Sequence, residues 1–229
     1  MSPRKGVIAE VLVYSLALLP ILAGCGESPP LDMSLLTGEP CEPPCWQGLT
    51  PGESTLQEVN EFMRTSRFVD PQTVDRSQLD RGGQPVGLII WWLSTVGGGR
   101  GYNSFSIEDG VLNYMTIYPD YPLTLERLIE RYGPPEKYVA GLRGWGFVPL
   151  DVAVTLFYPT HGFTVDLVLR ADDATLQPQS KVVSVWYFRA APLERFLELR
   201  IEAGYVSGTL ESSLESLHDW QGYGALDLD

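Results

Sequence analysis

The sequence predicts an α+β fold in which two units, each a helix followed by antiparallel strands, stand in tandem before a C-terminal helical segment. Three observations carry this prediction: amphipathic helical stripes, apolar strands joined by short turns, and a similar spacing of both along the chain. We place the units at residues 46–120 and 121–190, and the C-terminal helix and tail at residues 191–229.

Three segments carry apolar residues at helical spacing. Thr55 and Glu58 predict a capping box at the start of the first, and Gly133 before two prolines is typical of the end of the second. The third ends near Gly204. The stripes are Leu56, Val59, Phe62 and Met63; Leu125, Leu128, Ile129 and Tyr132; and Leu193, Phe196, Leu197 and Ile201.

The strands are expected between these helices. Residues 86–93 form a nearly continuous apolar run, as in a buried strand, and at least one of the alternating Trp91 and Trp92 should belong to the core. Asp109-Gly110 predicts a two-residue hairpin turn. The other strands are expected at residues 105–108, 111–118, 152–158, 163–170 and 181–189, with a second hairpin turn at 159–162.

The spacing of similar segments favours an internal repeat. Thr55 and Thr124, which precede the first two helices, are 69 residues apart. The Leu-Glu-Arg-Leu beginning at Leu125 is echoed 68 residues later by the Leu-Glu-Arg-Phe beginning at Leu193. Coincidence between short amphipathic helices is the alternative. Neither unit alone has much room for a core, so we expect the two sheets to join or pack.

The N-terminus is typical of an export signal. Arg4 and Lys5 precede an apolar run at residues 11–23. As a helix this run would reach roughly 20 Å, which is less than the hydrocarbon core of about 30 Å. A cleaved signal at residues 1–24 is therefore favoured over a permanent transmembrane helix.

Leu22-Ala23-Gly24-Cys25 resembles the lipobox of bacterial lipoproteins. The resemblance implies cleavage before Cys25, lipid on its sulfur and anchorage outside the cytoplasm, at the outer membrane if the cell has two membranes. The alternative is an ordinary secretory signal with a free Cys25. We expect residues 25–45 to form the lipidated start and a proline-rich segment, with residues 26–40 as a tether.

A second resemblance concerns the fold. Residues 49–59, with Pro51-Gly52 before the first helix, look like the opening of small outer-membrane-assembly lipoproteins, and Tyr132-Gly133-Pro134 is similar to their helix exit. The β-lactamase-inhibitor-like proteins share this α+β layout as tandem units. Here the opening and the exit fall in different units, so the resemblance assigns no functional residue.

Composition excludes some partners. Hydrophobic residues make up 44% of the 229 residues, and the formal net charge is −13. Cleavage after residue 24 would remove two positive charges and one negative charge, which gives −14. Nucleic acids and anionic lipid head groups both attract basic surfaces, so we expect neither as an electrostatic partner.

The remaining cysteines predict a disulfide. Cys41 and Cys45 are one residue too far apart for a Cys-x-x-Cys redox motif, and a disulfide persists outside the cytoplasm. A zinc site needs about four ligands. With His161 and His218 far apart in the sequence, we expect no metal and no cofactor.

No pattern of catalytic residues is evident. His161 falls in a predicted turn, and the adjacent His218 and Asp219 are neighbours that rarely face each other. The glycine run at residues 97–101 lacks the lysine and the Ser/Thr of a phosphate loop. We therefore expect a protein that is not an enzyme. A hydrolase whose catalytic residues follow no recognised pattern is the least favoured of three possibilities, and the other two are protein binding and the binding of a small molecule or carbohydrate.

Aromatic residues near loops are the candidate binding residues: Trp46, Trp145, Phe147, Trp220 and Tyr223. The alternative is that each ring covers the end of a sheet. The expected function is a lipid-anchored envelope protein that binds or assembles with another protein. A surface receptor for a small molecule or carbohydrate is the second possibility.

Overall fold

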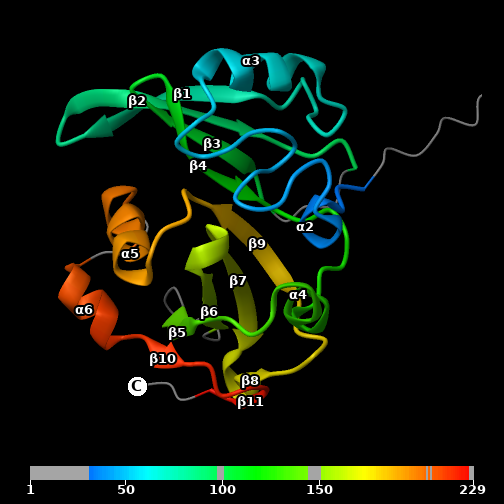
Figure 1. Ribbon diagram of the computed structural model, residues 1–229, viewed down its shortest axis with the longest axis vertical. Coiled ribbons are helices and arrows are strands. Elements are labelled where there is room, and N and C mark those ends of the chain that lie inside the picture. Colours follow the sequence, from blue (N-terminus) through cyan, green and yellow to red (C-terminus); the bar gives the residue numbers. More distant parts are fainter. Residues whose placement is uncertain (1–30, 97–100, 144–150, 205, 207, 227–229) are drawn as a thin grey trace, which may run out of the picture.

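The structure is a computed structural model that describes residues 31–96, 101–143, 151–204, 206 and 208–226 (Figure 1). The expected signal, at residues 1–24, and Cys25 lie outside this range. A large antiparallel sheet with few helices confirms the α+β class. In the described part of the chain, no helix has the length and hydropathy needed to span a bilayer.

Nine strands form one sheet in the order β1-β2-β3-β4-β9-β7-β6-β5-β10, and every neighbouring pair is antiparallel. Two halves meet where β4 pairs with β9. β8 and β11 form a small separate ladder. The bounds are β1 (Asp75–Arg81), β2 (Gln84–Trp92), β3 (Asn103–Glu108), β4 (Val111–Ile117), β5 (Lys137–Arg143), β6 (Asp151–Tyr158), β7 (Phe163–Arg170), β8 (Thr175–Leu176), β9 (Val182–Tyr187), β10 (His218–Asp219) and β11 (Gly224–Ala225).

The three predicted helices are confirmed. The capping box that opens α3 is complete, because the Thr55 side chain accepts from the Glu58 backbone and the Glu58 carboxylate accepts from the Thr55 backbone. α4 ends at Gly133, as the sequence predicts. The helices are α2 (Ser34–Thr37), α3 (Leu56–Thr65), α4 (Leu125–Tyr132), α5 (Leu193–Glu202) and α6 (Leu210–Glu215).

Both predicted hairpins are also confirmed. Asp109 and Gly110 turn the chain between β3 and β4 with positive φ angles of 49° and 77°. The sequence Asp-Gly suits this turn because both central residues of a type I′ turn need positive φ. Between β6 and β7, a 3₁₀ turn (Pro159–His161) is followed by Gly162 with φ 70°.

One face of the sheet, the inner face, carries the main core. Alternate side chains of the strands, such as Trp92 and Phe105, pack there with Leu35 of α2, Val59 of α3 and Leu128 of α4. All five are buried. At about 25 cal/mol per Å² of buried apolar surface, this layer is the largest stabilising feature of the fold.

The opposite side, the outer face, is covered by α5 and α6 over β4 and the second half of the sheet. Phe196 and Leu197 of α5 pack on Tyr114 of β4 and Phe157 of β6 in a second, smaller core. The guanidinium of Arg81, at the end of β1, donates to the carbonyl of Glu202 at 2.9 Å and so ties the helix to the β1–β2 hairpin. In Figure 1, α5 and α6 lie on the side of this hairpin's tip, while α2 and α4 lie on the opposite side.

Residues 31–40 are not a free tether. Leu35 is buried under the inner face, and the Tyr132 hydroxyl donates to its carbonyl. Burial of the apolar side of α2 explains the difference, because the described part of this segment gains more by packing than by remaining extended in solvent. Residues 26–30 lie outside the described range.

Several elements were not predicted. β5 lies between the second helix and the strand expected at residues 152–158, where we predicted no strand, and its ladder with β6 supplies partners for its backbone. The tail beyond α5 adds α6, then β10 on the edge of β5 and β11 on β8. After α5, residues 208–226 therefore run along the second half of the sheet, and we call this segment the C-terminal strap.

Candidate functional site

Trp46 lies in the core and is not a surface residue. Its side chain is 3% exposed, and its ring contacts Phe62, Trp92 and Phe105 with centroid distances of 5.3, 6.2 and 6.0 Å. The indole nitrogen donates to Asp32 at 2.5 Å. The Trp46 ring therefore covers the end of the sheet and does not form part of a binding surface.

Trp220 and Tyr223 lie together on the C-terminal strap. Their rings meet edge to face with centroids 6.2 Å apart. Trp220 is half-buried against the main core, whereas Tyr223 is 43% exposed. Of this pair, Tyr223 alone is an exposed residue.

Other predicted positions have separate outcomes. Cys41 and Cys45 form a disulfide, with Cα atoms 5.7 Å apart, which confirms that prediction. Trp145, Phe147 and the glycine run at residues 97–100 lie outside the described residues.

The two histidines serve packing. His161 contacts the ring of Tyr132 with centroids 5.2 Å apart. His218 stacks on Tyr138 at 5.1 Å, and the adjacent Asp219 pairs instead with Lys137 at 2.5 Å. His218 and Asp219 therefore have different partners and do not act as a base with its orienting acid.

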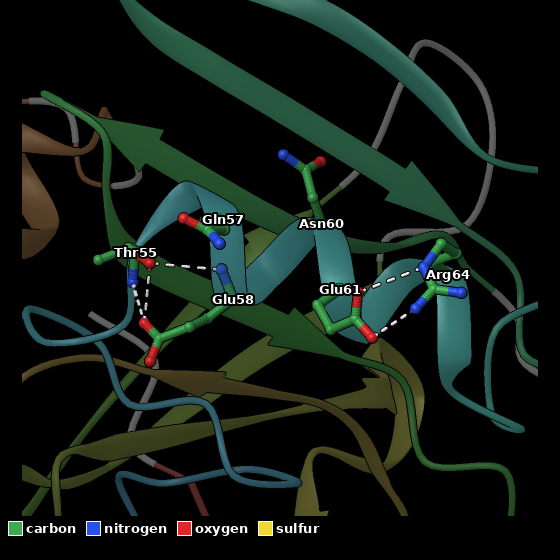
Figure 2. A pocket seen from close by; sticks show the side chains of 6 residues that line it. All are labelled: Thr55, Gln57, Glu58, Asn60, Glu61 and Arg64. Atoms are coloured by element: carbon green, nitrogen blue, oxygen red, sulfur yellow. Dashed lines mark hydrogen bonds and ion pairs between the residues drawn. The ribbon is translucent and has the colours of Figure 1, made fainter.

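Figure 2 shows an open groove along the solvent side of α3, where all the labelled side chains come from one stretch of chain. Glu58 accepts from the backbone and hydroxyl of Thr55, which lowers its pKa, and Glu61 pairs with Arg64 at 2.6 Å. These charges neutralise one another in solvent. The groove resembles an ordinary polar helix surface and contains no buried reactive group. Its lining residues are Thr55, Gln57, Glu58, Asn60, Glu61 and Arg64.

Two carboxylates meet in a crevice at the end of the inner face. The backbone N–H of Asp32 donates to Asp120 at 3.2 Å, and the hydroxyl of Ser94 donates to the other oxygen at 3.1 Å. Burial raises the pKa of Asp120, although these two hydrogen bonds act in the opposite direction. The cavity beside them has a volume of about 10 Å³, room for one water molecule. Such a space admits no substrate, and we regard the pair as a structural clamp.

In the described part of the chain, no group of three His, Cys, Asp or Glu side chains lies close enough together to hold a metal ion.

The part of the outer face that borders the smaller core, from Trp91 to Trp186, is the strongest candidate. A row of directly opposed residues crosses four strands from β2 to β9: Trp91, Ser104, Thr116 and Trp186. Two large rings thus stand at the ends of the row, and two small hydroxyl residues lie between them. Beside it runs a second row: Ile89, Ser106 and Tyr114. We call these seven residues the outer patch.

The hydroxyl groups of the patch are incompletely satisfied. Ser106 Oγ and Thr116 Oγ1 are buried and make no hydrogen bond within the described residues. A buried hydroxyl without a partner costs about 1–3 kcal/mol. Native structures contain few such groups, so two of them on adjacent strands need an explanation.

Trp186, at one side of the patch, is held by hydrogen bonds, whereas Trp91 and Ile89, at the other side, pack on neither core. The indole of Trp186 donates to Asp166 at 2.6 Å, and Asp166 also accepts from Ser184 at 2.8 Å. Trp91 and Ile89 are half-buried, yet neither of the two core clusters in the described chain includes them. The sequence had pointed to Trp91 and Trp92 as alternating residues, but it had no signal for the hydroxyl rows between the tryptophans.

Comparisons with protein-family models, with curated proteins and with solved structures found no significant match to this chain.

Proposed function

We propose that this chain is a lipid-anchored protein of the cell envelope that binds another protein through the outer patch and catalyses no reaction. The anchor is the lipid on Cys25, supported by the lipobox at residues 22–25. The single observation that carries the binding function is Trp91, which is half-buried outside both cores and stands next to Ser104 and the unpaired hydroxyls.

A tandem origin of the sheet fits this proposal. α3 is followed by β1 to β4, and α4 by β5, β6, β7 and β9, so each unit supplies one helix and four strands of the large sheet, and the ninth strand, β10, comes from the C-terminal tail. We infer two related units, at about residues 46–120 and 121–190, whose last strands, β4 and β9, pair at the centre. The outer patch crosses the junction between β4 and β9, so neither unit alone would form the complete patch.

The chemistry of the patch suits a protein partner. Tryptophan and tyrosine are enriched among residues that dominate binding energy, because they bury a large area at a small entropy cost. Packing a partner on Trp91 would remove the exposed part of its ring from water.

The absence of catalysis is supported by the environment of the residues that would be needed. Both histidines are occupied in ring contacts. The Asp32–Asp120 pair has space for one water only. The Thr55 hydroxyl lies beside the Glu58 carboxylate in the groove on α3, but both groups are engaged in the capping box that opens this helix.

The test is affinity capture with the full-length lipoprotein in detergent. A solubilised envelope extract is passed over the wild type, Trp91→Ala and Leu214→Ala. Leu214 is 37% exposed on α6, far from the patch in sequence, and is the matched control. The proposal expects a specific protein on the wild type and the control that is lost with Trp91→Ala.

Trp145→Ala is a second variant in the same experiment, because the sequence makes Trp145 a candidate binding residue. Equal recovery of the captured proteins by Trp91→Ala would overturn the patch as the binding surface. No captured protein, together with thermal stabilisation by saccharides, would favour the receptor for a small molecule or carbohydrate.

A further inference from the structure

The chain enters the fold at a fixed point. Asp32 accepts from the indole of Trp46 and from the amide of Gln47 at 2.9 Å, and its backbone donates to Asp120. Two residues later α2 begins, with Leu35 buried. The folded structure therefore starts at Asp32, not near residue 41 where a tether over residues 26–40 would end.

The distance to the lipid is consequently short. Six peptide steps separate Cys25 from Leu31, and a fully extended chain covers at most about 3.6 Å per residue, or about 22 Å in all. Strand β2 has nine residues and is about 30 Å long. If the β1–β2 turn faced the membrane, Leu31 would lie about the length of β2 from the bilayer surface. The segment between Cys25 and Leu31 is shorter than that, so it cannot span the distance.

Apolar side chains surround the point of entry. Leu31 is 47% exposed and Tyr102 is 57% exposed. They are the neighbours of Asp32 and Asn103, which line the same crevice together with Phe68 and other residues. Tyrosine is enriched at the membrane–water interface, where its ring lies among the head groups.

We propose that the end of the molecule marked by Leu31 and Tyr102 lies against the head-group region of the bilayer. The inference rests on the lipid anchor of the proposed function and adds a fixed orientation to it. The β1–β2 turn and α5 then point away from the membrane, because they lie opposite α2 (Figure 1). Because Asp32 and Asp120 at this end are carboxylates, the contact gains no attraction from anionic lipid.

This orientation also limits the partner. Trp91 is opposite Ser104, two residues from Tyr102, so the outer patch begins close to the membrane-facing end. A protein bound there stands near the bilayer surface, as a membrane-embedded or membrane-anchored partner would.

The test uses the acylated full-length protein in phosphatidylcholine vesicles. Cys25 carries the lipid and Cys41 is bonded to Cys45, so an introduced cysteine supplies the free thiol for a fluorophore. Tyr102→Cys places the probe at the proposed contact. Gln84→Cys is the matched control at the far end of β2, beside the β1–β2 turn and about 30 Å away along the strand.

Nitroxide-labelled lipids then quench probes near the bilayer. The proposal expects strong loss of fluorescence at residue 102 and little at residue 84, with no further loss at residue 102 when part of the lipid is anionic. Equal quenching of both probes in a vesicle-bound protein would overturn the orientation while the anchor stands. A protein that stays in the supernatant with an unmodified Cys25 would overturn the anchor and the orientation with it.

Discussion

Trp91 and Trp92 are neighbours on one strand and have different surroundings. Trp92 points to the inner face, is 0% exposed and packs on Phe105 with ring centroids 4.3 Å apart. Trp91 points to the outer face and belongs to neither core. Three helices and the N-terminal segment pack on the inner face, whereas the outer face carries a second core under α5 and α6 that does not include Trp91. The contrast shows that a strand apolar on both faces need not be buried on both faces within its own chain.

The largest effect is expected for the sealed face. Trp92→Ala removes a fully buried ring that contacts Trp46 and Phe105, and we expect it to lower the free energy of unfolding by about 3–5 kcal/mol. Urea unfolding of the wild type and the variant measures the difference. A loss below about 1 kcal/mol would mean that the two faces do not differ as described.

The N-terminal cover of the same face gives a smaller effect. Replacing Cys41 and Cys45 together by alanine opens the small loop immediately before Trp46. The chain-entropy model predicts a loss of about 2 kcal/mol, because the unfolded state regains freedom. Thermal unfolding with and without reductant provides the comparison, and the double variant should not respond to reductant.

The contribution of the Asp32–Asp120 clamp to the free energy of unfolding should depend on pH. Burial raises the pKa of Asp120 above its usual 3.8 in the folded state, so the folded protein binds this proton more tightly than the unfolded chain does. The resulting stability is present below pH 3.8 and is lost as pH rises through the raised pKa. An asparagine at this position does not ionise, so Asp120→Asn removes this pH-dependent loss of stability. Its amide keeps one oxygen that can accept a hydrogen bond.

We therefore expect Asp120→Asn to be more stable than the wild type at pH 7, with the difference shrinking towards pH 3.8. Urea unfolding at several pH values measures it. A variant that is less stable than the wild type at pH 7 would show that the hydrogen bonds from Asp32 and Ser94 outweigh the burial of the charge.

The smallest effect on stability is expected for the open face. Trp91→Ala should change the free energy of unfolding by no more than about 1 kcal/mol, because the ring packs on neither core. The matched comparison is Trp92→Ala in the same urea series. A loss for Trp91→Ala as large as that for Trp92→Ala would place Trp91 in the structural core.

The elements with strong local signals were predictable. The apolar stripe of α4 and the capping box of α3 are visible in the sequence because neighbouring residues specify them. Strand β1 has no such signal, since Asp75–Arg81 is mostly charged and exposed. It forms because β2 pairs with it along its length. β10 and β11, of two residues each, are likewise set by their partners.

The candidate site was predictable only in part. Ser104 and Ser106 alternate with Phe105 and Ile107, which indicates a strand with one apolar and one polar face. The sequence does not show which face the helices cover, and so it could not separate Trp46, which is buried, from Trp91. That choice depends on where α5 and the N-terminal segment pack, which is a property of the whole fold.

The most direct test of the account is oxidative footprinting of the two neighbouring tryptophans. Hydroxyl radicals are applied to the purified protein and to the protein in native envelope membranes, and oxidation at Trp91 and Trp92 is measured by mass spectrometry. We expect Trp92 to resist oxidation in both samples, and Trp91 to be oxidised in the purified protein and protected in the envelope, where its partner covers it. Equal oxidation of Trp91 in both samples would contradict the outer patch as a binding surface.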